Sequence, residues 1–335
     1  MKPIQDQILA VVYGGYSSEM EISVKSGKSV AGWLRNAGRT VYEVLLSREG
    51  WWAVIPSGSG EGKRWPIDRN DFSFTPEGEE RITFDKVFII IHGDPGENGR
   101  LQAYFEMLGI TYVGCSSQCA TIAFDKYACK SYLRDSGITM AADIMLRRED
   151  IYDPYDVART LGMPVFVKPC GGGSSFGVSK VSDPDAMDAA IEKAFTESDT
   201  VIVEKSIFGR EIDCGVYSTG EDARALPLIE IIPRREFFDY EAKYNGASSE
   251  LCPAPIPEAD RVRIQDAAVK IFKRLGCSGL VRMDFILGVD GRPYFLEVNP
   301  NPGMTEASLV PQMVRQAGMT MEEFLTGLID RTVEE

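Results

Sequence analysis

Two carboxylates and an amide in the C-terminal third of the chain have the types and spacing of a cation site. Asp284 lies in an apolar run that reads as a strand, and Glu297 and Asn299 close a second such run. The Asp290-Gly291 pair between the runs predicts a β-hairpin. Since residues two apart on a strand point to the same face, the hairpin can place all three side chains on one wall. Such oxygen donors suit Mg²⁺, which usually keeps waters and takes its other ligands from substrate phosphates.

The alternative for these residues is the solvent face of an ordinary antiparallel hairpin, which is the commoner case for an isolated pattern of this kind. Two neighbouring features favour a metal site. Arg282 lies two residues before Asp284 on the same strand face, and Asn299 opens a turn rich in proline and glycine that leads towards a helix. A cation, two acids, an amide and a tight turn therefore converge on one edge, which predicts a site for a metal–nucleotide.

A glycine-rich run at residues 171–177 lies between two predicted strands. A P-loop or a dinucleotide fingerprint needs another spacing and another context, so the run is neither. A flexible loop with exposed N–H groups and hydroxyls can close over phosphates, and it can also be a mobile hairpin tip. Lys168, at the end of the preceding strand, favours phosphate binding.

Other polar groups allow a binding role and an ordinary one. Glu204 and Lys205 end a predicted strand, whose backbone can hydrogen-bond an adenine edge, while the following carboxylate of Glu211 can accept from ribose hydroxyls. Taken alone, these residues would more often form a charged strand end. The polar, aromatic segment 239–246 is either a connection between elements or a functional loop.

Two residues of the N-terminal third leave the same choice open. His92 is either an ordinary histidine at a strand end or a group that orients a carboxylate in a cleft, where Gly93 lets a ligand approach. Glu19 either interacts with the dipole of the first helix or receives a substrate ammonium beside the Gly14-Gly15 turn.

The elements that must position these residues alternate between strands and helices, which indicates an α/β protein. The first helix should start with a capping box formed by Ser18 and Glu21 and stop at Gly38. Segment 57–80 is expected to form surface hairpins or loops. Strands are predicted at residues 8–13, 41–46, 86–91, 165–168, 201–205, 212–218, 225–232, 279–287 and 293–298, and further helices at 100–108, 118–136, 184–195, 258–275, 306–316 and 321–331.

Composition limits the class of protein. A chain of 335 residues is expected to form two or three domains. A net charge of −14 argues against nucleic acid and anionic membrane as partners, but it allows a small anionic ligand held by a few lysines and backbone N–H groups. No apolar run approaches the ~18 residues of a membrane span. Because residues 1–7 show no signal-peptide pattern, a cytoplasmic location is expected.

The cysteines do not suggest a site. Their number, seven, is odd, they are scattered along the chain, and no C-x-x-C spacing occurs. Reduced thiols are therefore expected. A zinc site is improbable, since His92 is the single histidine that could help.

Taken together, these motifs resemble the D-alanine–D-alanine ligase family of the ATP-grasp superfamily over nearly the whole chain. Each motif alone is weak, but their occurrence in this order is highly specific. They are G-G-Y-S-S-E at 14–19, H-G-D-P-G-E-N-G at 92–99, D-K at 125–126, V-K-P with G-S-S-F-G-V-S-K-V at 167–181, E-K at 204–205, D-Y-E-A-K-Y at 239–244, R-M-D at 282–284 and E-V-N-P-N-P-G-M-T-E-A-S-L-V-P at 297–311.

The resemblance implies a three-domain ATP-grasp fold with ATP clamped between two antiparallel sheets. Residues 1–117 would form a Rossmann-like pre-ATP-grasp domain, and residues 118–205 a central ATP-grasp subdomain with the glycine-rich lid. Residues 206–335 would form a C-terminal subdomain with the Mg²⁺ and oxyanion site. Because the family is commonly dimeric through the first domain, a homodimer is expected.

The resemblance also implies a role for each matching residue. Asp284, Glu297 and Asn299 would hold Mg²⁺ or Mn²⁺, with two ions expected. The ATP contacts would be Lys126, Lys168 and Ser175 on the phosphates, Glu204, Lys205 and Ile207 along the adenine, and Glu211 on the ribose. The substrate contacts would be Glu19 on the ammonium of the first D-alanine, His92 near that substrate, and Ser308 with the backbone of Gly303 and Leu309 on the second carboxylate.

The implied reaction joins two D-alanine molecules for peptidoglycan precursor synthesis. The first carboxylate attacks the γ-phosphate of ATP to give an acyl phosphate, and the amine of the second D-alanine then displaces phosphate. Lys243 and the metal ions would spread charge on the transferred phosphoryl group, and Arg282 would stabilise the oxyanion. Glu19, Ser174 and Tyr244 would form a hydrogen-bonded triad that closes the site against water.

Three other functions remain as alternatives. A relative that uses D-lactate or D-serine as the second substrate is the nearest, although Tyr244 favours the dipeptide-forming type. A non-catalytic nucleotide-binding protein on the same fold should lack a metal ligand or the oxyanion cation, and Asp284, Glu297, Asn299 and Arg282 are all present. A nicotinamide-dependent dehydrogenase is suggested only by the Gly14-Gly15 turn, without the required G-x-G-x-x-G.

Overall fold

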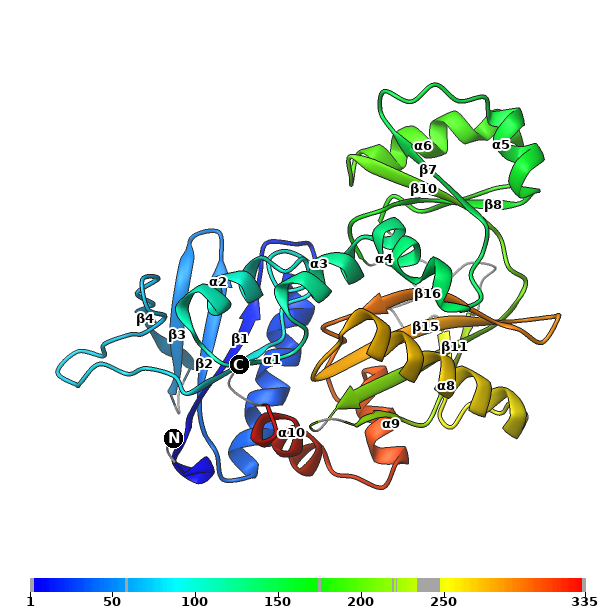
Figure 1. Ribbon diagram of the computed structural model, residues 1–335. Helices are drawn as coiled ribbons and strands as arrows, with labels where there is room; N and C mark the ends of the chain where they lie inside the picture. Colours follow the sequence, from blue (N-terminus) through cyan, green and yellow to red (C-terminus); the bar gives the residue numbers. More distant parts are fainter. Residues whose placement is uncertain are drawn as a thin grey trace.

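The computed structural model describes residues 3–57, 60–173, 176–218, 220, 222–233 and 248–332. This part of the chain forms three β-sheets, each from one continuous stretch of sequence (Figure 1). The sheets lie between residues 8 and 113, 143 and 205, and 209 and 299. Each sheet therefore falls inside one of the three expected ranges, while the domain boundaries themselves stay a prediction.

The first sheet has the strand order β4-β3-β2-β1-β5-β6. Its central strand β1 pairs in parallel with β2 and β5, and alternate residues of β1 face helices on opposite sides. Leu9 and Val11 pack with α1, whereas Ala10 and Val12 pack with α2, which explains the continuous apolar run. The elements are β1 (Ile8–Gly14), α1 (Met20–Asn36), β2 (Thr40–Ser47), β3 (Gly50–Ser57), β4 (Gly60–Pro66), β5 (Lys86–Ile89), α2 (Arg100–Leu108) and β6 (Tyr112–Val113).

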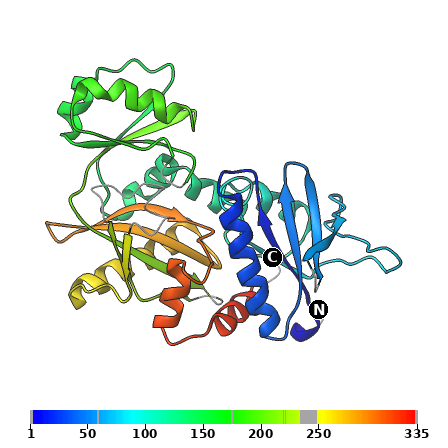
Figure 2. The same ribbon diagram turned by 180° about the vertical axis from the view of Figure 1, so that it is seen from behind.

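The second sheet is antiparallel, with the order β7-β10-β8-β9. Helices α5 and α6 share one apolar core with it, and the whole unit stands apart from the other two sheets in both views (Figures 1 and 2). The glycine-rich run lies between β8 and β10, the two predicted strands, and is followed by β9, which was not predicted. The elements are β7 (Asp143–Arg147), α5 (Pro154–Leu161), β8 (Val165–Pro169), β9 (Ser179–Val181), α6 (Met187–Phe195) and β10 (Thr200–Lys205).

The third sheet has the order β14-β13-β11-β15-β16, and β12 pairs with β11. Helix α8 packs on its apolar face. The elements are β11 (Gly209–Ser218), β12 (Ala223–Ala225), β13 (Ile229–Pro233), β14 (Ser248–Leu251), α8 (Glu258–Leu275), β15 (Leu280–Gly288), β16 (Pro293–Asn299), α9 (Leu309–Gln316) and α10 (Met321–Asp330).

Two sets of helices tie the sheets together. Helices α3 (Ser117–Phe124) and α4 (Lys126–Leu133) contribute to the same core as the third sheet and α8. The last helix, α10, returns to α1 of the first unit, which Figure 2 shows from behind. Lys86 anchors this return, because its Nζ donates to the carbonyl oxygens of Ile329 (2.8 Å) and Thr332 (2.9 Å).

Two helix predictions were wrong. The expected helix 118–136 is two helices, because Asp125 has extended backbone angles (φ −91°, ψ 111°) and its side chain caps α4 by accepting from the N–H of Ala128. Ser18 and Glu21 form no capping box, since α1 begins at Met20 and its N-cap is Glu19. The hydroxyl of Ser17 accepts from the N–H of Glu19 instead and fixes the turn before the helix.

The structure also contains strands and a helix that no strong sequence pattern predicted. Strands β3, β6, β7, β9 and β14 and helix α5 were not predicted, and β4 lies inside the segment that was expected to be hairpins or loops. The strand expected at 225–232 is interrupted and forms the end of β12 and most of β13. Helix α9 begins three residues later than expected. The mixed α/β class is confirmed. Among the helices described, none is long and apolar enough to cross a membrane.

Candidate active site

The β15/β16 hairpin forms the wall of the candidate site. In its register Asp284 faces Glu297, and Arg282 faces Asn299. On the other side of β15, Asp213 of β11 is the partner of Asp284. The predicted hairpin is confirmed, and it brings the four predicted side chains to adjoining positions.

Arg282 is held against two carboxylates. Its Nε and one terminal nitrogen donate to the two oxygens of Asp284, at 2.7 and 2.8 Å, and Nε lies 3.2 Å from Asp213. Asn299 also donates its amide to Asp284 at 3.1 Å. Burial alone would lower the pKa of Arg282, but Asp284 and Asp213 raise it well above its usual range. The guanidinium therefore stays charged although it is buried, in the bidentate geometry that suits carboxylate partners.

A cavity of about 390 Å³ opens over this wall and separates the third sheet from the first unit. Its lining carries many more acids than bases. Among the described residues, the acidic ones that line it are Glu19, Glu97, Glu211, Asp213, Glu250, Asp284 and Glu297, and the basic ones are Lys25 and Arg282. Asn299, His92, Gly303, Ser308 and Leu309 complete the set of predicted site residues at its surface.

The first unit contributes Glu19 and His92 to the opposite side of the cavity. Glu19 is the N-cap of α1, and Ser17 links it to the loop after β5 by donating to the carbonyl oxygen of His92 at 2.7 Å. Gly93 follows with a positive φ of 71°, and a Cβ there would lie 2.8 Å from Ser17. A glycine is therefore required for the close approach of the loop to the start of α1.

The imidazole of His92 is buried, and its partners define its tautomer. Nδ1 lies 2.9 Å from the carbonyl oxygen of Asn301, which can only accept, so Nδ1 carries the proton. Nε2 lies 3.4 Å from the Ser26 hydroxyl. Burial lowers the pKa of His92, against the opposing effect of the Glu19 carboxylate. A neutral imidazole thus joins α1, the loop after β5 and the proline-rich turn of the third unit.

The turn after β16 presents the start of α9 to the cavity. Ser308 is the N-cap of α9, and its hydroxyl lies 2.7 Å from that of Thr305. Ser308, Leu309 and Val310 all line the cavity. The first N–H groups of a helix lack intrahelical partners and favour negative charge, so this corner suits a carboxylate.

Two predicted lysines lie beside the wall, one on α4 and one on β8. Lys126, the first residue of α4, lies 3.4 Å from Glu297 and donates to the carbonyl oxygen of Gly172 at 2.9 Å. Lys168, on β8, lies 2.7 Å from Glu204 on β10. Both lysines are thus near the glycine-rich loop and the acidic wall, although neither lines the 390 Å³ cavity.

Glu204 takes part in a buried network of ion pairs that was not predicted from the sequence. Lys130 of α4 lies 2.5 Å from Glu204, 3.0 Å from Asp143 and 3.0 Å from the carbonyl oxygen of Ala141. Its three ammonium protons are thereby satisfied. Burial alone would raise the pKa of Glu204, but Lys168 and Lys130 lower it to about 2. The carboxylate predicted to line the adenine is therefore held between two lysines.

Glu97 is a second residue that received no role from the sequence. It lies in the H-G-D-P-G-E-N-G motif, lines the cavity and accepts from the N–H of Gly93 at 2.8 Å. Burial, together with the nearby charge of Glu19, raises its pKa to about 8. An acid inside a glycine-rich loop was the available signal. At neutral pH Glu97 is mostly protonated and does not add to the charge that Glu19 carries.

Several predicted site residues are not brought to the cavity or lie elsewhere. Ser174, Ser175, Lys243 and Tyr244 lie outside the described residues. Lys205 is exposed at the end of β10, and its backbone N–H donates to the carbonyl oxygen of Ala142. Lys205 and Ile207 do not line the cavity of the acidic wall, so the roles predicted for them along the adenine stay predictions.

Comparison with known proteins gives the class and then the family. Solved structures that share the whole three-sheet arrangement include D-alanyl-alanine synthetase A from Vibrio cholerae (TM-score 0.86, 29% identity, 98% of each chain). They also include the VanG D-Ala:D-Ser ligase from Enterococcus faecalis (TM-score 0.84, 32% identity, 98% of this chain and 99% of that one). The D-alanine–D-alanine ligase from Bacillus anthracis complexed with ATP matches with a TM-score of 0.77 at 28% identity over 97% of each chain. The chain is thus an ATP-grasp ligase.

Sequence models described as the N-terminus and C-terminus of D-ala D-ala ligase match residues 8–115 and 132–330. The D-alanine–D-alanine ligase of Phocaeicola vulgatus is 43% identical over 324 residues, which cover 96% of this chain and 98% of that protein. This protein belongs to the D-alanine–D-alanine ligase family.

Proposed function

We propose that this protein joins two molecules of D-alanine into D-alanyl-D-alanine, with ATP converted to ADP and phosphate, for peptidoglycan precursor synthesis. The observation that carries the proposal is the β15/β16 register, which sets Asp284 against Glu297 and Arg282 against Asn299 on one wall of the cavity. Family membership gives the substrates, and the register supplies the groups that the chemistry requires.

The donor set of the wall fits a hard divalent cation. Asp284, Glu297 and Asn299 offer carboxylate and amide oxygens, and the acidic lining supplies the negative charge that attracts a cation. The hydrogen bonds from Arg282 leave Asp284 able to bind a metal ion, because each carboxylate oxygen has two lone-pair directions. These three residues would hold two divalent ions, Mg²⁺ or Mn²⁺. When bound, such ions neutralise charge on the β- and γ-phosphates of the nucleotide.

The lysines beside the wall would hold ATP. Lys126 and Lys168 flank the glycine-rich loop, so both can approach phosphate oxygens from the side of the central unit. Lys168 would leave Glu204 to do so, while Lys130 keeps that carboxylate charged and in place. Ser175 on the loop, Lys205 and Ile207 beyond β10, and Glu211 on β11 complete the predicted contacts.

The two ends of the cavity would bind the two substrates. Glu19, at the start of α1, would pair with the ammonium of the first D-alanine, next to the neutral His92. The α9 N-terminus at Ser308 and Leu309, with Gly303 beside it, would take the carboxylate of the second. The first carboxylate would then point at the γ-phosphate, and the second amine would approach the acyl phosphate.

Arg282 would act on the charge that develops when the amine attacks. A buried guanidinium already fixed by Asp284 and Asp213 needs little reorganisation to donate to an oxyanion. Lys243 would share the charge of the transferred phosphoryl group. A triad of Glu19, Ser174 and Tyr244 would hold the glycine-rich loop closed, which protects the acyl phosphate from water.

A product with D-lactate or D-serine is not favoured. The relatives that share 40–43% of their residues with this chain are named D-alanine–D-alanine ligase. Membership of the family also supports a cytoplasmic location and a homodimer for this protein.

Product analysis tests the function. The protein is incubated with ATP, Mg²⁺ and D-alanine, alone or with D-lactate or D-serine in excess, and the products are identified by mass spectrometry. We expect D-alanyl-D-alanine and an equal amount of phosphate. Faster phosphate release with D-lactate or D-serine, with the mixed product in the majority, would contradict the proposed second substrate.

A further inference from the structure

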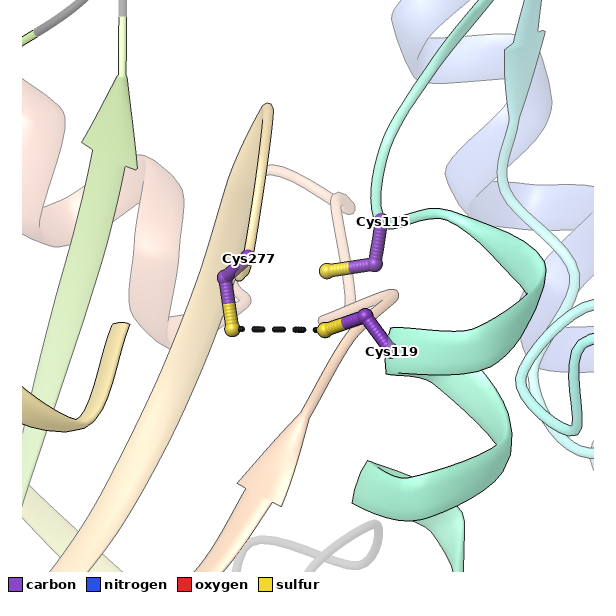
Figure 3. A group of neighbouring side chains, drawn as sticks. All are labelled: Cys115, Cys119 and Cys277. Atoms are coloured by element: carbon purple, nitrogen blue, oxygen red, sulfur yellow. Dashed lines mark hydrogen bonds between the residues drawn. The ribbon is translucent and has the colours of Figure 1, made fainter. Parts of the chain in front are cut away.

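Three cysteines from two distant segments meet in the core of the third unit (Figure 3). Cys115 lies between β6 and α3, Cys119 lies in the first turn of α3, and Cys277 lies between α8 and β15. Their sulfur atoms all lie within 4.8 Å of one another, and those of Cys119 and Cys277 are 3.6 Å apart. They are 1%, 2% and 9% exposed. The scatter of cysteines along the sequence concealed this cluster.

The spacing of the sulfurs matches a shared ligand. Three thiolates at about 2.3 Å from one cation are about 4 Å from one another. The observed separations therefore need adjustments of less than about 1 Å to reach that arrangement. All three thiols are free rather than joined in a disulfide.

The two segments that carry the sulfurs are fixed to each other. The Ser278 hydroxyl donates to the carbonyl oxygen of Gly114, next to Cys115. Gly279 approaches the same residue so closely that a Cβ would lie 2.9 Å from the N–H nitrogen of Gly114. The sulfurs are thus held together by backbone on both sides, so binding a ligand would order little that is not already ordered.

We propose that Cys115, Cys119 and Cys277 bind one soft cation, and that Cu(I) fits the site best. Thiolate sulfur selects soft metal ions. In the described part of the chain the cluster contains no fourth histidine, cysteine or carboxylate ligand, whereas Zn²⁺ in structural sites takes four. Cu(I) accepts three sulfurs. The bound ion would tie the segment before α3 to the loop after α8, and it would release thiol protons on binding.

Competition binding tests the proposal. The full-length protein is reduced, freed of metal and titrated anaerobically with Cu(I) in the presence of a chromophoric Cu(I) chelator. We expect one tightly held ion per chain and a higher midpoint of thermal unfolding. The variants Cys119→Ala and Cys277→Ala should lose both effects. The matched control is Cys214→Ala, which removes a buried sulfur from the same core outside the cluster and should retain both.

A spectroscopic measurement on the unmodified protein covers the case in which a variant fails to fold. X-ray absorption of the Cu(I)-loaded chain should give three sulfur ligands at one distance. Absence of tight binding, equal binding by Cys119→Ala, or a ligand shell without three sulfurs would overturn the proposal. A Cys119–Cys277 disulfide that forms under these conditions without bound ion would do so as well.

Discussion

The acidic cavity and the buried network around Lys130 both gather charges, but in different proportions. In the network Lys130, Lys168 and the exposed Arg134 contact two carboxylates, Glu204 and Asp143. The described lining of the cavity has seven acidic residues against two basic ones. The carboxylates of the network therefore have cationic partners within the described chain, whereas acids outnumber bases in the described lining of the cavity, which favours a bound cation. Lys130 and Asp143 therefore stabilise the fold, the acidic lining is proposed to bind a cation, and Lys168 and Glu204 connect the network to the proposed ATP site.

The largest loss of activity is expected when the buried guanidinium of Arg282 is removed. Arg282→Ala should lower kcat by about 10²–10³-fold, the usual result of removing one donor to an oxyanion. Steady-state kinetics with ATP and D-alanine measures this effect. Arg282→Lys is the matched variant, and it should recover little because a lysine cannot reproduce the bidentate pair with Asp284. Nearly normal turnover in Arg282→Ala would remove Arg282 from the reaction.

A change in the buried network should act on stability instead. Lys130→Met removes the only cation that contacts both Glu204 and Asp143 among the described ion pairs, and it should lower the free energy of unfolding by about 3 kcal/mol or more. Denaturant unfolding measures the loss. The control Arg159→Ala breaks an exposed pair with Asp156 and should change stability by less than about 0.5 kcal/mol. Equal losses in the two variants would show that the buried network stabilises the fold no more than an exposed ion pair does.

The sequence predicted the wall of the cavity because the necessary information is local. Arg282, Asp284, Glu297 and Asn299 lie on two strands joined by a short turn, so the period of a strand and the turn residues suffice to bring them together. Asp213 was missed, since its position depends on the pairing of β11 with β15, which are about seventy residues apart.

The same limit explains the other residues that sequence reasoning did not find. In the sequence Lys130 is indistinguishable from an ordinary helix residue, because its partners lie on β7 and β10 and meet it only in the folded chain. Cys115 and Cys277 are separated by more than one hundred and sixty positions, and no local pattern marks them as neighbours. Short strands such as β7 and β9 were missed because a few residues carry too little periodicity to separate strand from loop.

The pH dependence of stability should distinguish Glu97 from the other acids of the cavity. Its pKa is about 8 in the folded protein, against an ordinary value near 4.5. Between these pH values the folded state holds more protons than the unfolded state, so this contribution to stability is full below pH 4.5 and is lost as pH rises through 8.

Glu97→Gln cannot titrate, and its stability relative to the unmodified protein should therefore rise between pH 5 and pH 8, by about 3 kcal/mol. Thermal or denaturant unfolding at the two pH values checks the sign. A relative stability that stays constant or falls over this range would mean that Glu97 is ionised in the cavity.

The most direct test of the account measures dipeptide and ADP in the same sample, with Mg²⁺ and after chelation by EDTA. The unmodified protein should form D-alanyl-D-alanine and ADP in equal amounts with Mg²⁺ and neither with EDTA, and added Mg²⁺ should restore both. Asp284→Asn should form neither at comparable rates, while unfolding shows that it is folded. ADP without dipeptide, or undiminished dipeptide synthesis by Asp284→Asn, would contradict the claim that this acidic wall binds a metal–nucleotide and couples two D-alanines.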